Sequence, residues 1–158
     1  VSLILMILVN KKNRELLNIN VKELVLINEM SMTIGLVMLT IGNFLGGMWA
    51  NESWGRYWGW DPKETWALIS IMVYAFVIHM RLIPGLKSNF AFTVASILSF
   101  GSIIMTYFGV NFYLAGLHSY AKDDQEISLV FISITLVIIL ILSLLAYPKY
   151  KKYLKNNR

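Results

Sequence analysis

Two histidines and a concentration of tryptophans are the residues of this chain whose chemistry stands out. His79 lies in the apolar segment YAFVIHMRL and His118 in GVNFYLAGLHSYA. All five tryptophans fall between Trp49 and Trp66, in WANESWGRYWGWDPKETW. An ionisable side chain within an apolar segment is costly to bury unpaired, so His79 is a candidate functional residue. The alternatives are a neutral His79 ring bonded to a neighbouring helix, and a His118 that is merely solvated at a membrane surface.

The tryptophan-rich stretch holds more large rings than a membrane interface requires. Trp and Tyr collect at interfaces as an aromatic belt, which accounts for Trp49 and Trp66 beside the neighbouring apolar segments. Gly55 and Gly59 allow the chain between them to turn, so that its rings share a surface suited to a large, flat, apolar ligand. The rings that the belt leaves unexplained are Trp54, Tyr57, Trp58 and Trp60.

The charged residues of this stretch have two different expected roles. Asp61 suits the N-cap of a following helix, Pro62 its first position and Glu64 the reciprocal position of a capping box. These residues are therefore expected to begin a helix. Arg56 and Lys63 are the only cations in the stretch, and they could meet either an anionic group on a ligand or lipid phosphate.

The composition indicates a membrane protein. The 158 residues are 57% hydrophobic and 15% charged, with a mean hydropathy of +0.61. A soluble domain is usually about 45–50% apolar and about 25% charged. The absence of cysteine from the sequence excludes disulfides, thiolate metal sites and thiol–disulfide exchange by this chain.

Four apolar segments predict an all-α fold, a polytopic transmembrane bundle. Each has about 20 residues, enough at ~1.5 Å per residue to cross a ~30 Å hydrocarbon core. Residues 1–9 are too few to span and are interpreted as the tail of a truncated upstream span, and residues 10–28 as a cytoplasmic segment lying in the interface. We therefore expect the chain to be the C-terminal part of a longer protein. The predicted membrane domain, residues 29–147, has its spans at 29–48, 64–83, 90–110 and 127–147.

Positive charge predicts which side each loop faces. All but three of the fourteen Lys and Arg lie in residues 10–28, in the turn 81–88 and in the tail 148–158. Because positive loops stay cytoplasmic, the tryptophan loop 49–63 and the second histidine's loop 111–126 are expected outside. The net charge of +5 is then a topology signal, and no nucleic-acid partner is expected.

Small residues recur on the first predicted span. Gly42 and Gly46 are four apart, and Gly35 lies about two turns earlier on the same face. This spacing favours close packing between helices, and the alternative is that the glycines make room for a bulky ligand.

Heme is the ligand that fits these residues. Its porphyrin supplies a flat face for stacking, its propionates a negative edge, and its iron a site for imidazole. His118 is expected on the same side as the tryptophans, whereas thirteen helical residues after Trp66 put His79 ~20 Å deeper. If both histidines bind iron, there are two heme positions, one in the membrane and one at its outer surface.

The motifs also resemble a known family. The segment WGRYWGWDPKETWALI resembles the WWD signature of heme-handling proteins in cytochrome c biogenesis. Together with GGMWANESWG, VYAFVIHMRL and TYFGVNFYLAGLHSYA, it is similar to the CcsA/ResC type of the system II pathway, over roughly residues 24–121. The resemblance implies an integral protein of the bacterial cytoplasmic membrane, or of the thylakoid if plastid-encoded. Such a protein holds b-type heme in transit and presents it outside for covalent attachment to the CxxCH of apocytochrome c.

The resemblance also implies roles for individual residues. His118 matches an outer axial ligand of heme iron, and His79 matches an axial ligand within the membrane. The remaining ligands would come from a second outer histidine upstream and from a ResB/CcsB-type partner or fused domain, neither of which is in this sequence. The residues implied to contact the outer heme are those of the WWD loop, Trp49, Trp54, Arg56, Tyr57, Trp58, Trp60, Asp61, Lys63 and Trp66.

No residue of the chain is expected to act as an acid–base catalyst. Within a cytochrome c synthase (heme lyase) complex its contribution would be positioning, and alone it would be incomplete. Three other interpretations stay open. They are a heme transporter without attachment activity, a membrane subunit with a structural b-type heme, and a subunit that packs against lipid without a cofactor.

Overall fold

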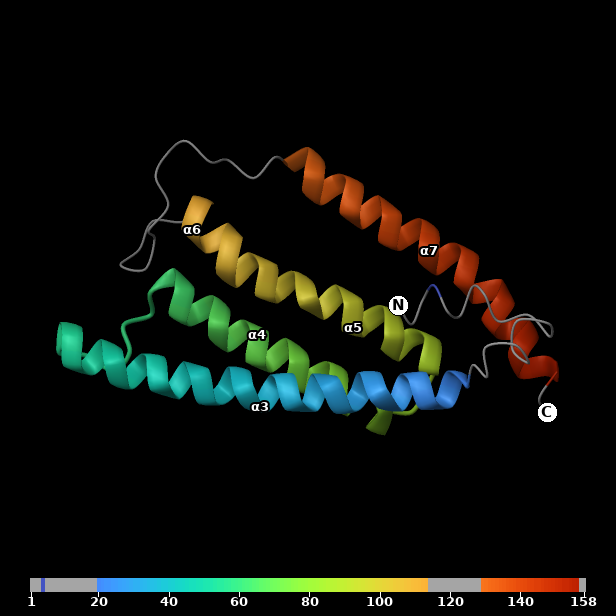
Figure 1. Cartoon of the computed structure of the whole chain (residues 1–158), viewed down its shortest axis with the longest axis horizontal. Helices are drawn as coiled ribbons and strands as arrows, with labels where there is room; N and C mark the ends of the chain where they lie inside the picture. The colour runs from blue at the N-terminus through green and yellow to red at the C-terminus, as the bar shows by residue number, and fades with distance from the viewer. Residues whose placement is uncertain (1–3, 5–19, 114–128, 157–158) are drawn as a thin grey trace.

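The chain forms a bundle of long helices. The computed structural model describes residue 4, residues 20–113 and residues 129–156. In these ranges every regular element is helical, and four helices are long and apolar enough to cross a membrane. The predicted all-α polytopic class is confirmed. The long helices in Figure 1 are α3 (Val21–Trp54), α4 (Pro62–His79), α5 (Asn89–Ile104) and α7 (Leu129–Asn156).

Helix α3 is longer than the predicted span at both ends. It begins after Asn20, whose Oδ1 accepts a hydrogen bond from the Lys22 N–H at 3.1 Å. It ends at Gly55, which adopts a left-handed φ of 71°. Because no proline interrupts it, residues 21–28 continue directly into the span and form no separate interfacial helix. Its 34 residues make about 50 Å of helix, more than a ~30 Å hydrocarbon core needs.

Helix α4 begins as its sequence predicts. Asp61 is the N-cap, Pro62 occupies the first turn, and the capping box between Asp61 and Glu64 is formed in both directions. The helix continues through one 3-10 turn, η1 (Met80–Leu82). The apolar segment Pro62–Leu82 therefore corresponds closely to the predicted span.

Helix α5 continues through a π turn, η2 (Met105–Gly109), into the short α6 (Val110–Tyr113). A Cβ at Gly109 would lie 2.1 Å from Met105 Sδ, so a larger residue there would require the Met105 side chain to move. The hydroxyl of Thr106, in the turn, lies 2.9 Å from the hydroxyl of Ser70 and 3.1 Å from the carbonyl oxygen of Trp66. These bonds fasten the π turn to α4 near the tryptophan loop.

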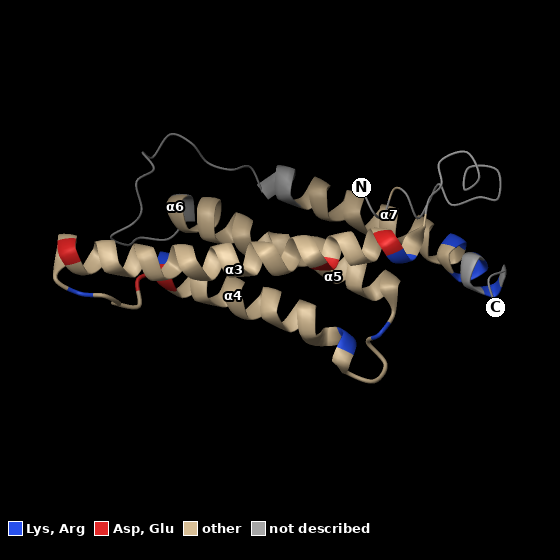
Figure 2. Ribbon diagram, turned by 60° about the horizontal axis from the view of Figure 1, so that its bottom comes forward, with Lys and Arg blue, Asp and Glu red and all other residues tan. Residues whose placement is uncertain are grey.

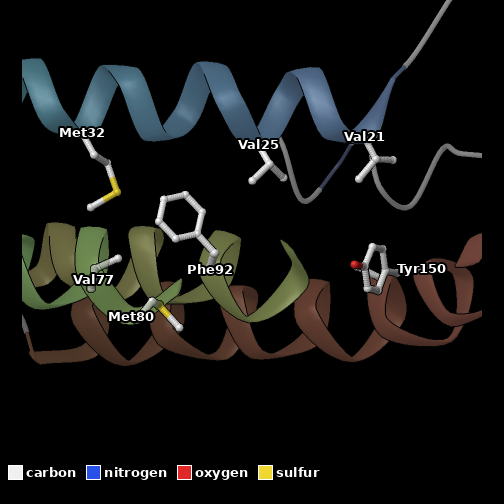
Figure 3. Close-up of a cluster of buried hydrophobic side chains, with 8 residues drawn as sticks. Val21, Val25, Met32, Val77, Met80, Phe92 and Tyr150 are labelled. Atoms are coloured by element: carbon white, nitrogen blue, oxygen red, sulfur yellow. The ribbon is translucent and has the colours of Figure 1, made fainter. Parts of the chain in front are cut away.

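The buried core lies toward the end of the bundle opposite the tryptophans. Phe92 of α5 is fully buried and lies between side chains of α3 and of the α4–η1 segment (Figure 3). Helix α7 joins this core where Tyr150 stacks on Phe90 at a centroid distance of 6.0 Å. The core residues are Val21, Val25, Met32, Val77, Met80, Phe92, Ala146 and Tyr150.

The outer surface of the helices is apolar as well. Ile34 and Met38 on α3, Phe76 on α4 and Leu144 on α7 are each more than half exposed. In Figure 2, the Lys, Arg, Asp and Glu residues of the described helices lie toward the two ends of the bundle. The helical segments between these ends carry no charged residues. Such a surface requires hydrocarbon around it, and the chain is an integral membrane protein. Which end faces the cytoplasm stays a prediction from charge.

One charged cluster joins three elements near the core. The Arg81 guanidinium in η1 forms an ion pair with Glu29 of α3 and donates a hydrogen bond to Asn89 Oδ1 of α5 at 2.7 Å. It also lies 5.0 Å from the centre of the Phe92 ring. The Arg81 and Glu29 side chains are each 29% exposed, so removal of one leaves the other partly desolvated.

Replacing Arg81 by Ala should lower the free energy of unfolding by about 1–3 kcal/mol, between the values for exposed and for buried pairs. Lys87→Ala, which removes an exposed cation from the same turn, should change it by less than about 0.5 kcal/mol. Unfolding of the detergent-solubilised protein, followed by circular dichroism, measures both. Equal effects of the two variants would contradict a structural role for the Arg81 cluster.

Candidate functional site

The tryptophan-rich stretch is built from two helix ends and a short link. Trp49 and Trp54 lie on the last turns of α3, and Trp66 lies near the start of α4. Only residues 55–61 between the helices are non-helical. The predicted loop 49–63 is therefore shorter than expected, since its first six residues belong to α3.

The tryptophan rings form edge-to-face pairs. Trp49 and Trp54 meet at a centroid distance of 5.1 Å and an interplanar angle of 78°. Trp58 and Trp60 meet at 5.7 Å and 89°. This is a favoured geometry for aromatic pairs. Trp60 is 70% exposed, so its indole is available to a ligand.

Tyr57 folds the link back onto α3. Its hydroxyl donates a hydrogen bond to the Phe44 carbonyl oxygen at 3.2 Å, and its ring lies against Gly47. A Cβ at Gly47 would come within 2.7 Å of Tyr57 Cζ. Gly42 and Gly46, by contrast, have no atom within 4 Å of an added Cβ. Among the described residues, Gly42 and Gly46 therefore do not make the predicted close contacts between helices. The neighbouring Gly47 makes a close contact, with the Tyr57 ring.

The two cations of the stretch are both placed against the protein. The Arg56 guanidinium covers the backbone of Gly59, where an added Cβ would lie 1.0 Å from Nη1. Lys63 Nζ donates a hydrogen bond to Asn111 Oδ1 of α6 at 3.2 Å. Lys63 thereby connects the start of α4 to the element that precedes His118. His118 itself lies outside the described residues, and its ligand role stays a prediction.

Trp60 has an unusual backbone. Its φ of 57° is the only positive value among the described non-glycine residues, and a left-handed conformation costs such a residue roughly 1–2 kcal/mol. Glu64 Oε2 accepts hydrogen bonds from Gly59 N at 2.7 Å and from Asp61 N at 3.2 Å. The Thr65 hydroxyl donates to the Trp60 carbonyl oxygen at 3.4 Å.

His79 is the last residue of α4, far along the helix from the tryptophans. Its Nδ1 lies 2.7 Å from the Ala75 carbonyl oxygen, which can only accept, so Nδ1 carries the proton. In the neutral ring Nε2 then has a free lone pair, as a metal-ligating imidazole requires. His79 is exposed on the same face of α4 as Phe76 and Met72. The partner of Nδ1 is thus in α4 itself and not on a neighbouring helix, as the alternative interpretation had it.

Sequence reasoning assigned no site role to four residues that shape this region. The sequence predicts the capping box of Asp61 and Glu64. It does not show that the Glu64 carboxylate also accepts a hydrogen bond from the Gly59 N–H. Thr65, Asn111 and Gly47 lie within or beside the quoted motifs. Their side-chain partners depend on tertiary contacts that local patterns do not show.

The described residues contain no preformed metal cluster. No group of three or more His, Cys, Asp or Glu within them could hold a metal ion. Within the described residues His79 therefore offers one imidazole, and completion of each iron site by ligands from elsewhere stays a prediction.

These features define a polytopic helical membrane protein with an aromatic loop at the end of two spans. Residues 1–118 match the family model described as "Cytochrome C assembly protein". The chain belongs to this family.

Curated relatives agree with the family match. Protein NrfI of Wolinella succinogenes is 53% identical over 137 residues, which are 87% of this chain and 15% of that protein. Cytochrome c biogenesis protein CcsA of Cyanophora paradoxa is 51% identical over 88 residues, 56% of this chain and 27% of the relative. Cytochrome c biogenesis protein CcsA of Cuscuta reflexa is 48% identical over 102 residues, which are 65% of this chain and 33% of that relative. The chain thus spans a third or less of these relatives, and the predicted resemblance to the CcsA type is confirmed.

Gly47→Ala should displace Tyr57 and destabilise the loop by about 1–3 kcal/mol, because the new methyl group overlaps the ring. Gly46→Ala, one position earlier in the same helix, meets no atom and should stabilise α3 by up to about 1 kcal/mol. Unfolding followed by tryptophan emission measures both. A loop that responds equally to the two variants would rule out the Tyr57–Gly47 contact.

Proposed function

We propose that this chain is the part of a cytochrome c biogenesis protein that holds heme and presents it at the outer membrane surface. Its loop would hold heme there until the two thiols of an apocytochrome CxxCH motif react with the vinyl groups. The heme is cargo, and this chain contributes position and orientation. Family membership supports the general role, and the site residues support the finer statement.

The observation that carries this proposal is the exposed indole of Trp60 on a braced link at the end of two membrane helices. An aromatic surface of this kind suits a planar macrocycle. The link is braced by Tyr57 on one side and by the capping box on the other. Arg56, which covers Gly59 of the link, and Lys63, which reaches Asn111, would supply positive charge for propionates.

His79 supports a second heme position within the membrane. Its Nε2 is free to bind iron, and the exposed apolar face around it, with Phe76 and Met72, suits both a porphyrin and a partner helix. A ResB/CcsB-type subunit or fused domain would complete that site. Heme would then move from the His79 site to the tryptophan loop, where His118 would be an axial ligand.

The attachment step itself needs no proton-transfer residue in this chain. Each cysteine S–H adds across one vinyl double bond, so that sulfur bonds to one carbon and hydrogen to the other. No electrons are gained or lost in the addition. Holding the vinyl edge within reach of the thiols accelerates such a reaction through proximity.

His118→Ala should abolish maturation of a co-expressed c-type cytochrome by the full-length protein with its partner, because the outer heme loses an axial ligand. Heme staining of the cytochrome after denaturing electrophoresis measures covalent attachment. Wild-type maturation by the variant, at equal membrane abundance, would refute the ligand role. Heme bound by the wild-type complex without any attachment to apocytochrome under reducing conditions would favour transport alone.

His79→Gly should reduce the heme that copurifies with the complex, and imidazole in the growth medium should restore it by filling the vacated ligand position. The Soret band per mole of protein measures the effect. Ile69→Gly, at an exposed position of the same helix, is the control for the effect of a glycine on α4. A His79→Gly complex with undiminished heme would contradict the membrane site.

A further inference from the structure

The strained backbone of Trp60 requires an explanation. A non-glycine residue with positive φ persists only where its surroundings fix it, and such residues concentrate at functional sites. Trp60 has a φ of 57° and is 70% exposed. Its side chain is largely exposed and its one ring contact that the structure gives is with Trp58 of the same link, so polar contacts around its backbone are the main restraint on this conformation.

Those contacts come from the first turn of α4. The Glu64 carboxylate binds the N–H groups on either side of Trp60, with one oxygen 2.7 Å from Gly59 N and 3.2 Å from Asp61 N. The Thr65 hydroxyl reaches the Trp60 carbonyl oxygen at 3.4 Å. Glu64 and Thr65 thus tie the Trp58–Gly59 and Trp60–Asp61 peptide units to the first turn of α4.

A capping box alone does not account for this arrangement. Such a box needs only the bond from the N3 carboxylate to the N-cap N–H, here Asp61. The bond to Gly59 is additional and is the shorter of the two. The same Glu64 oxygen therefore completes the capping box of α4 and restrains the turn from which the Trp60 indole projects.

We propose that Glu64 is a positioning residue that holds Trp60 in its left-handed backbone and so presets the exposed indole for stacking on a planar ligand. This proposal rests on the heme-presenting function proposed above. Without the carboxylate, Trp60 relaxes toward the ordinary β region and its ring leaves the edge-to-face pair with Trp58.

The position of Trp60 can be tested without any ligand. All five tryptophans of this chain lie in residues 49–66, so 5-fluorotryptophan labelling gives ¹⁹F resonances from this region, assigned by single Trp→Phe variants. Glu64→Ala should shift and broaden the Trp60 resonance. Glu64→Gln, which keeps an acceptor oxygen, should leave it as in the wild type. Glu52→Ala removes an exposed acid at the end of α3 and should also leave it unchanged.

Heme titration of the full-length protein then tests the consequence. Glu64→Ala should raise the Kd for heme about three- to tenfold, the range expected for loss of one aromatic contact. Glu64→Gln should restore near-wild-type affinity. In a Trp60→Phe background, whose own Kd is the reference, Glu64→Ala should have a smaller effect, because a carboxylate that acts through the indole has less to position.

The two measurements separate the possible failures. An unchanged Trp60 resonance in Glu64→Ala overturns the positioning role, whatever heme does. A shifted resonance with no heme binding by the wild-type loop overturns the heme-presenting function but leaves the placement of Trp60 by Glu64 established. An equal effect of Glu64→Ala on the heme Kd in both backgrounds shows that Glu64 acts on helix stability instead, and also overturns the proposal.

Discussion

The apolar exterior of the helices is the constraint on which the rest of the structure depends. Side chains that face outward on α3, α4 and α7 are as hydrophobic as those inside, so burial against protein cannot be the main force that orders the bundle. The packed core around Phe92 occupies one end only. Polar contacts such as the Arg81 cluster therefore determine helix positions to a larger degree than in a soluble protein, and charged chemistry is confined to the two ends.

The tryptophan loop illustrates the same principle at the opposite end. Among the described residues the main hydrophobic cluster does not include the loop, and a few directional bonds hold the loop's shape. Tyr57 ties it to α3, Lys63 connects the start of α4 to Asn111, and Thr106 binds the Trp66 carbonyl oxygen from the π turn. Because these bonds hold its backbone in place, the loop can keep large indoles exposed instead of folding over them. Exposed and preset rings are what a site for a removable planar cargo needs.

The sequence predicts the fold class, the helices and the start of α4, because hydrophobic length and capping residues are local signals. It does not predict that α3 runs unbroken from Val21 to Trp54. The polar residues after Asn20 and the glycines suggest helix ends, but they do not end this helix. It identifies the aromatic residues of the candidate site by type. The roles of Glu64, Asn111 and Gly47 escape it, because these depend on a backbone angle at Trp60 and on contacts between helices. His118 lies outside the described residues, and its role stays a prediction from the sequence.

The place of His79 bears on how heme would be released in the proposed scheme. His79 offers a single Nε2, with Nδ1 fixed by Ala75, and stands about 20 Å along α4 from Trp66. Two imidazoles from one rigid bundle would hold iron with little chance of exchange. In the proposed arrangement, one imidazole from this chain at each level would pair with a ligand from another segment, so that one bond could break while the other persists. Such a division of ligands would suit heme in transit better than a structural heme, for which paired histidines on adjacent helices would hold the iron more firmly.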